Sequence, residues 1–144
     1  MFYSLFINNI SKQKAVIKME QKILIVDDEA HIRMLIEQTL EELEDEGVEF
    51  LTAENGEIAL EIIQKENPKL VFLDVMMPKM NGMEVCRRVK KELDLKDVFI
   101  VLLTAKGQEL DRQRGQEVGA DVYMTKPFDP EIILSKAKEV LGIE

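Results

Sequence analysis

The sequence contains little cysteine and no long hydrophobic run, and each shortage excludes a class of protein. Cys86 is the only cysteine among 144 residues, so the chain cannot form an internal disulfide, and a reducing cytoplasm fits. It stands in a helical pattern between Val85 and Val89, which predicts a core residue and not a nucleophile. The N-terminal apolar stretch, Phe2–Ile7, is too short to span a bilayer, and its lysines follow it, the reverse of a secretory signal. We therefore expect a cytoplasmic protein without a membrane partner.

Positive charge is also scarce. Lysine and arginine total 19 against 28 aspartate and glutamate residues, which leaves a net charge of -9. Because phosphate binding needs a basic face, nucleic acid is not expected as a partner. Part of the negative charge is concentrated in Glu41–Glu46, which we interpret as a solvated helix end.

What remains is the composition of one globular domain. Hydrophobic residues make up 46% and charged residues 33%, and the length suffices for one hydrophobic core. The sequence has no internal repeat and no linker to a second domain. We expect residues 21–144 to fold and residues 1–20 to be a dispensable extension, such as the product of a start codon upstream of Met19. The alternative for the extension is a weak contact with a membrane surface or a partner.

Strands and helices alternate from Gln21 onward. Runs rich in β-branched or aliphatic residues predict strands at Lys22–Val26, Val48–Thr52, Leu70–Leu73, Val98–Leu103 and Val122–Thr125. Near-continuous apolar strands of this kind are typical of a parallel sheet with helices on both faces. We therefore predict an α/β fold.

Helices are predicted between these strands. The first covers Ile32–Gly47, where the glycine supplies the stop, and the third covers about Val85–Leu93. Asn55 and Asp129 are the predicted N-caps of the second and last helices. The fourth, Gln108–Val118, is weakly amphipathic and contains a glycine, which predicts a mobile or partner-facing element.

Five polar residues stand where these strands end: Asp27, Asp28, Asp74, Thr104 and Lys126. The carboxyl ends of parallel strands line one crevice, and ligands bind there in open α/β sheets. We therefore expect three carboxylates, one hydroxyl and one ammonium group to share a pocket.

This set of side chains suits phosphoryl chemistry. Adjacent carboxylates repel one another unless a cation neutralises them, and an all-oxygen site suits Mg²⁺. The alternative is that the first two acids are solvated and cap the first helix. Asp74, held rigidly at a strand end, can attack phosphorus and form an acyl phosphate, while Lys126 balances the charge. Thr104 can donate to a phosphoryl oxygen, although a β-branched residue is also ordinary at a strand end.

Four motifs in this order resemble the receiver domain of two-component response regulators, most closely its stand-alone chemotaxis type. They are Ile23–Glu29, Asp74–Pro78 followed by Asn81-Gly82, Leu103–Ala105 and Lys126–Phe128. The resemblance runs from about Lys22 to the C-terminus. It implies a doubly wound, flavodoxin-like sheet of five strands in the order 2-1-3-4-5.

The resemblance also implies a chemical role for the pocket. Asp74 would be phosphorylated by a phosphohistidine of a sensor kinase or phosphotransfer protein. Mg²⁺ would be held by Asp27, Asp28, Asp74 and the backbone carbonyl of Met76. Such a protein accepts a phosphoryl group on itself, so we expect no turnover of an external substrate.

A conformational switch is implied as well. The hydroxyl of Thr104 would move toward the phosphoryl group, and the aromatic Tyr123 would follow. Taken alone, Tyr123 reads as a strand aromatic half buried against the last helix. A cis peptide bond between Lys126 and Pro127 would aim the ammonium group into the pocket.

Two further positions bear on the phosphorylated state. Met76 and Lys106 resemble family positions that control how water reaches the acyl phosphate, and their bulk predicts slow decay. The only histidine, His31, is expected on the surface and not as a phosphodonor.

Two other functions share part of this pattern. A phosphohydrolase of the haloacid dehalogenase type also uses Asp, Thr, Lys and Mg²⁺, but places a second acid where this chain has Met76, and carries a cap insertion. An interaction module that has lost the chemistry would not need the complete pocket.

The output is expected to pass through another protein, because no DNA-binding or catalytic domain is recognised in the sequence. A motor switch, a kinase network and a phosphate relay all remain open. The predicted contact surface combines the fourth helix, the fifth strand and the last helix. We expect it to bind either a partner protein or, in a dimer that forms on phosphorylation, a second copy of this chain. Otherwise the protein is expected to be a monomer.

Overall fold

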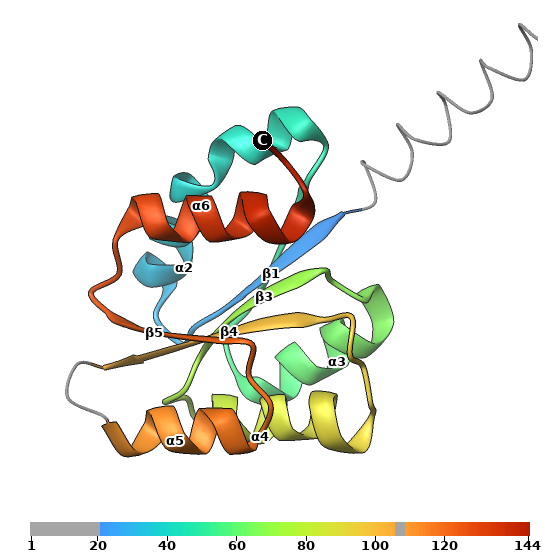
Figure 1. Cartoon of the computed structure of the whole chain (residues 1–144), viewed down its shortest axis with the longest axis vertical. Coiled ribbons are helices and arrows are strands. Elements are labelled where there is room, and N and C mark those ends of the chain that lie inside the picture. The colour runs from blue at the N-terminus through green and yellow to red at the C-terminus, as the bar shows by residue number, and fades with distance from the viewer. Residues whose placement is uncertain (1–20, 106–108) are drawn as a thin grey trace, which may run out of the picture.

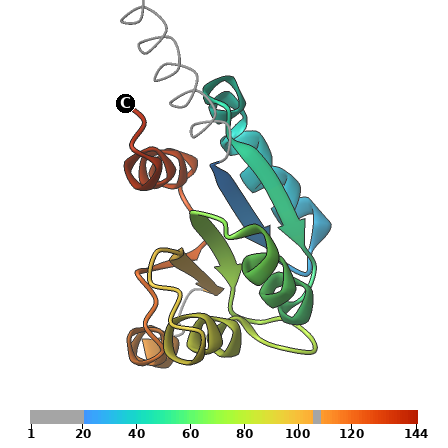
Figure 2. The same cartoon turned by 90° about the vertical axis from the view of Figure 1, so that its right-hand side faces the viewer.

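The computed structural model describes residues 21–105 and 109–144, and its centre is a five-stranded parallel sheet (Figure 1). The strands lie in the order β2-β1-β3-β4-β5, as predicted, and Figure 2 shows them side by side. Their bounds are β1 Lys22–Val26, β2 Glu49–Ala53, β3 Leu70–Asp74, β4 Phe99–Ala105 and β5 Val122–Lys126. The expectations for residues 1–20 and for Lys106 lie outside the described residues.

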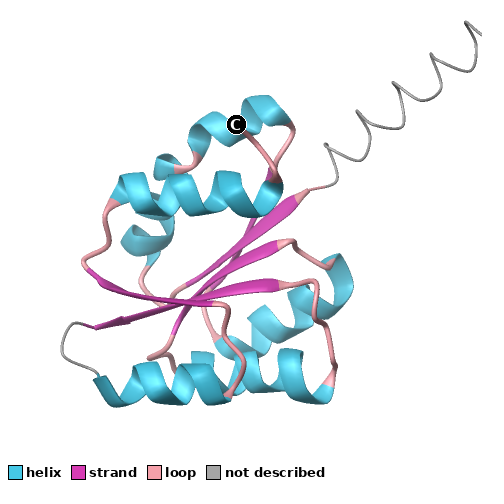
Figure 3. Ribbon diagram, viewed as in Figure 1, coloured by secondary structure: helices cyan, strands magenta, loops and turns pink. Residues whose placement is uncertain are grey.

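Helices cover both faces of the sheet (Figure 3). They are α2 Ala30–Thr39, α3 Gly56–Glu66, α4 Gly82–Arg87, α5 Glu109–Glu117 and α6 Pro130–Leu141, with a 3₁₀ turn at Glu41–Glu46 and a π turn at Arg88–Glu92. One apolar cluster joins the sheet to α2 and α6, and the other joins it to α3 and α4 on the face that α5 also covers. The α/β prediction is therefore confirmed.

Local sequence sets where the helices begin. The side chain of Asn55 accepts from the backbone N–H of Ile58 at 2.9 Å, and that of Asp129 accepts from Glu131 at 2.9 Å. Both are the predicted N-caps, and each satisfies a backbone donor that the first helical turn leaves unpaired. Among the described residues, no helix is long and apolar enough to cross a membrane.

Two predicted helices differ from those observed. The first α-helix ends at Thr39 and is followed by the 3₁₀ turn, in which Leu43 is buried. Gly47 ends this turn in the left-handed conformation, with φ 82°. The third changes to a π turn after Arg87, where Lys90 donates to the carbonyl of Val98 at 2.6 Å. Both changes coincide with tertiary contacts that periodicity does not report.

Strand boundaries shift by one or two residues from those predicted. β2 begins and ends one residue later, and β4 extends through Thr104 to Ala105. Asp74 and Lys126 are themselves the last residues of β3 and β5. Asp74, Thr104 and Lys126 are therefore held by the sheet itself, whereas Asp27 and Asp28 directly follow the end of β1.

Candidate functional site

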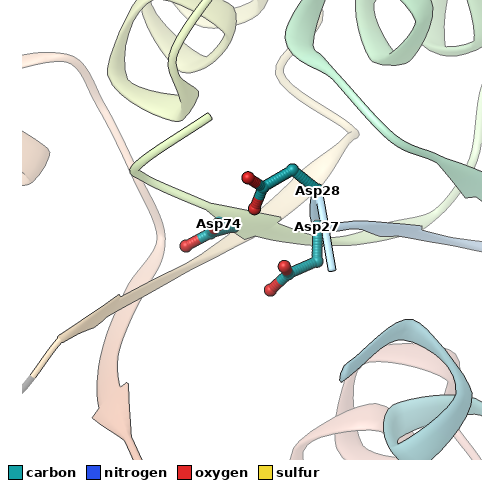
Figure 4. Close-up of side chains that lie close together, drawn as sticks. All are labelled: Asp27, Asp28 and Asp74. Carbon is teal, nitrogen blue, oxygen red and sulfur yellow. The ribbon is translucent and has the colours of Figure 1, made fainter. Parts of the chain in front are cut away.

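Three carboxylates meet where β1 and β3 end (Figure 4). One oxygen from each of Asp27, Asp28 and Asp74 lies within 4.8 Å of the others. Asp27 is fully buried and Asp74 is 5% exposed, whereas Asp28 is exposed. The reading of Asp27 as a solvated loop acid is therefore wrong. An all-oxygen set with two buried carboxylates matches what a hard divalent cation such as Mg²⁺ requires.

Sheet register explains why these residues meet. β1 pairs with β3 so that Val26 lies opposite Leu73, which places Asp27 and Asp74 at adjacent strand ends. On the other side, Asp74 lies opposite Leu103, one residue before Thr104. Thr104 is 1% exposed, so its hydroxyl belongs to the interior of the site.

Lys126 joins the two buried carboxylates. Its Nζ atom lies 2.8 Å from Oδ2 of Asp27 and 3.2 Å from Oδ1 of Asp74. Burial opposes the charged form, but the hydrogen bond and charge of Asp27 and of Asp74 outweigh it and raise the pKa of Lys126. The peptide bond that follows, Lys126-Pro127, is cis, as predicted.

The surroundings of Asp74 favour its protonated form. Burial and then the negative charge of Asp27 raise its pKa from 3.8 to about 6, with Asp28 adding to the rise and Lys126 opposing it. The uncompensated charge is what a divalent cation would neutralise. A buried carboxylate can act as a nucleophile toward an anionic electrophile when a neighbouring cation offsets the repulsion between them. Here the ammonium group of Lys126 is that cation.

This shift predicts a pH-dependent stability difference between the protein and its Asp74→Asn variant. Since the pKa of Asp74 is about 6 when folded and 3.8 ordinarily, the folded state binds the proton more tightly. Stability is therefore lost as pH rises from about 4 through about 6. With allowance for solvent screening, we expect the free energy of unfolding of Asp74→Asn to exceed that of the unmodified protein by on the order of 1 to 2 kcal/mol at pH 7 in EDTA.

The measurement is urea denaturation of both proteins at several pH values. The difference should shrink toward zero near pH 4, where the carboxyl group is protonated in both states. An equal difference at every pH would contradict the prediction, because the effect would then not arise from ionisation.

Two residues support the site in ways that the sequence did not reveal. Arg33 donates from Nη1 to the backbone carbonyl of Asp27 at 2.6 Å, but in sequence it resembles any charged residue of a surface helix. Gly82 lets α4 start directly against Asp74, since a Cβ there would overlap the carbonyl oxygen of Asp74. The pair Asn81-Gly82 was part of the motif, but the sequence did not reveal this close approach.

Tyr123 lies on a different face from the one expected. It packs with the cluster on the side of α3 and α4, next to Gly115 of α5, and not against α6. Its neighbours Val122 and Met124 contact the α6 cluster instead, because successive strand residues point to opposite faces. The guanidinium carbon of Arg112 lies 5.3 Å from the centroid of the Tyr123 ring.

The remaining expectations concern single residues. Met76 is 68% exposed, next to the carboxylate cluster in sequence. Cys86 is fully buried, and burial raises the pKa of its thiol to about 12, so the core assignment is confirmed. His31 is exposed, and its Nε2 lies 3.4 Å from the carboxylate of Glu29.

Comparisons with known proteins point to one family. A family model described as the response regulator receiver domain matches residues 23–138. The chain is 49% identical over 122 residues to a probable transcriptional regulator, ycf27, of Porphyra purpurea, covering 85% of this chain and 48% of that protein. It is 44% identical over 124 residues to the alkaline phosphatase synthesis transcriptional regulatory protein PhoP of Bacillus subtilis, covering 85% and 49%.

A solved structure agrees with these relatives. The chemotaxis response regulator CheY4 of Vibrio cholerae aligns with a TM-score of 0.71 at 36% identity, covering 83% of this chain and 98% of that chain. The chain thus spans nearly all of that solved chain, but only 48% and 49% of the two transcriptional regulators.

Proposed function

This chain belongs to the response regulator receiver family of two-component systems, and from that membership we propose that it accepts a phosphoryl group on Asp74. The observation that carries the proposal is the buried carboxylate of Asp74, which lies with two other carboxylates and is bridged to one of them by Lys126. The donor is a phosphohistidine of a sensor kinase or phosphotransfer protein. Residues 21–144 form the receiver, and residues 1–20 lie outside it.

The proposed reaction is a single phosphoryl transfer. A carboxylate oxygen of Asp74 forms a bond to phosphorus while the bond from phosphorus to the histidine nitrogen breaks, and its electron pair stays on the imidazole. The product is an acyl phosphate. Lys126 then balances the charge that builds on the phosphoryl oxygens, and Thr104 donates its hydroxyl to one of them. Mg²⁺, when bound, adds further positive charge at these oxygens.

We assign the metal to Asp27, Asp28, Asp74 and the backbone carbonyl of Met76. Both carboxylate oxygens of Asp27 already accept hydrogen bonds, from the N–H of Glu29 at 2.9 Å and from Lys126 at 2.8 Å. Asp27 therefore orients the other groups of the site as well as adding charge. Asp28 has its carboxylate exposed and is the more accessible ligand.

The phosphohydrolase alternative is less well supported. Such an enzyme needs a proton donor two residues after the nucleophile, and the thioether of Met76 has no proton to give. The pocket is therefore suited to receive a phosphoryl group and hold it, without turnover of an external substrate.

The proposed output is a contact with another protein in the cytoplasm. Phosphorylation would draw the hydroxyl of Thr104 toward the phosphoryl group and move Tyr123, which changes the surface made by α5, β5 and α6. The net charge of -9 favours a protein surface over nucleic acid for this domain, although two relatives are transcriptional regulators. We propose that the domain acts as a stand-alone switch, a monomer or a dimer linked to phosphorylation.

Labelling by a small phosphodonor tests the function. Incubation with acetyl phosphate and Mg²⁺ should give one phosphorylated species on a phosphate-affinity gel, because the pocket supplies the nucleophile and the charge balance. EDTA should suppress it, and hydroxylamine, which cleaves acyl phosphates, should remove it. Absence of labelling with Mg²⁺, or label that survives hydroxylamine, would argue against the proposal.

The lifetime of the label is a separate prediction. The long thioether of Met76, and the side chain of Lys106, should hinder an in-line water molecule, so we expect decay to be slow once the donor is removed. A Met76→Asn variant, with a shorter and polar side chain, should lose the label faster. Decay of the unmodified protein within seconds on the same gel would show this idea to be wrong.

A further inference from the structure

Helix α5 approaches the sheet most closely at Gly115. This residue is buried, whereas Arg112, Gln113, Arg114, Gln116 and Glu117 of the same helix are exposed. A Cβ atom built on Gly115 would lie 3.2 Å from Cδ1 of Leu102 and 3.3 Å from Cδ2 of Tyr123. Both distances are shorter than ordinary carbon contacts, which are about 3.5 to 4.0 Å.

The backbone does not explain the glycine. Gly115 is not among the glycines with positive φ, which are Gly47, Gly119 and Gly142. Inside a helix, glycine is a weaker helix former than alanine. The missing side chain therefore matters for the space that it leaves, and Leu102 and Tyr123 occupy that space from neighbouring strands.

Tyr123 is bounded on three sides. Leu102 lies beside it in the sheet register, Gly115 lies against the ring edge, and the guanidinium group of Arg112 lies over the ring. A cavity of about 200 Å³ lies beside the ring, and its lining includes Gly115 and Arg112 themselves together with Gln116 and Ala120. The ring therefore has a close wall at Gly115 and free volume beside it.

We propose that Gly115 is the positioning residue for Tyr123 and thereby sets how strongly the state of Asp74 is read out at the α5–β5 surface. The positioning of Tyr123 by Gly115 is independent of the proposed phosphoacceptor function, whereas the readout of the state of Asp74 rests on it. A methyl group at position 115 would lie 3.3 Å from Cδ2 of Tyr123 and would push the ring away from α5 toward the solvent. The inward position that Tyr123 must reach during switching would then be closed.

The test measures the exposure of one tyrosine. The chain has no tryptophan and two tyrosines, so the full-length protein with Tyr3→Phe leaves Tyr123 as the only strong emitter. Acrylamide quenching of its fluorescence is compared in this parent, in Gly115→Ala and in the bulkier Gly115→Val. Gln113→Ala is the matched control, because Gln113 is exposed on the same helix. Each protein is measured alone and with Mg²⁺ and beryllofluoride, a mimic of the phosphoryl group.

We expect the quenching slope to rise in Gly115→Ala and further in Gly115→Val, and to stay at the parent value in Gln113→Ala. The change in slope that beryllofluoride causes in the parent should fall by at least half in Gly115→Ala. Labelling with acetyl phosphate should stay within about twofold of the parent, because the variant leaves the pocket intact. A merely structural glycine would change stability without this graded movement of the ring.

Two results would overturn the inference. One is an unchanged slope in Gly115→Ala without phosphodonor, since the ring would then not be set by Gly115. The other is a full beryllofluoride response in a variant whose ring has moved. Failure of the parent to label would reject the phosphoacceptor function, while the comparison without phosphodonor would still decide whether Gly115 positions Tyr123. Circular dichroism before each series confirms that both substituted helices have folded.

Discussion

Asp74→Asn is expected to abolish labelling by acetyl phosphate and by any cognate phosphohistidine donor. The amide keeps the shape of the side chain and its place at the end of β3, but its oxygen is a poor nucleophile and cannot form the acyl phosphate. Asp27 cannot replace it, because Asp27 is buried with both carboxylate oxygens hydrogen bonded. Labelling on a phosphate-affinity gel should therefore fall to background.

A matched control separates chemistry from charge. Asp94→Asn makes the same substitution at an acid whose side chain is 69% exposed and contacts only Lys96 at 3.7 Å among the ion pairs of the described residues. This control should label at the rate of the unmodified protein. Label that persists in Asp74→Asn and maps to another carboxylate would assign the acceptor elsewhere in the pocket.

Lys126→Met is expected to slow labelling by about a hundredfold or more. The ammonium group is the one cation within bonding distance of both Asp27 and Asp74 among the described residues. Removing it leaves the charge that builds on the phosphoryl oxygens with less compensation, and the loss of one such electrostatic contact typically costs 10²- to 10³-fold in rate. The measurement is the initial rate of labelling at saturating Mg²⁺.

The control for this variant is Lys136→Met. Lys136 is a lysine of α6 that pairs with Glu139 at 3.0 Å and takes no part in the pocket, so its loss should leave the rate unchanged. Lys126→Arg keeps the charge but not the compact ammonium shape, and we expect only partial recovery. A rate for Lys126→Met within twofold of the unmodified protein would mean that Lys126 does not assist the transfer.

Much of the fold and of the pocket was predictable because both depend on local pattern. Apolar runs followed by polar residues identify strand ends, and parallel topology makes those ends meet. Asn55 and Asp129 act as caps through bonds to residues two or three positions away, so their roles are written in the sequence nearby. The meeting of Asp27, Asp28 and Asp74 follows from the same logic.

Contacts between distant elements were not predictable in the same way. The face on which Tyr123 packs depends on the register of β5 and on where α5 lies, and the sequence pattern placed it on the wrong side. Gly115 reads as a weak point of a poor helix until Leu102 and Tyr123 are seen against it. Likewise, only the folded chain brings Arg33 to the carbonyl of Asp27.

The sequence by itself determined the order of strands and helices and the identity of the polar residues at the strand ends, because periodicity and capping act over a few residues. Only the tertiary structure decided how those residues are charged and what they touch. Burial and the charge of Asp27 raise the pKa of Asp74, and Lys126 reaches both acids from a strand that lies far along the chain. These effects arise from desolvation and from distances of a few ångströms between distant segments, which exist only once the sheet has formed.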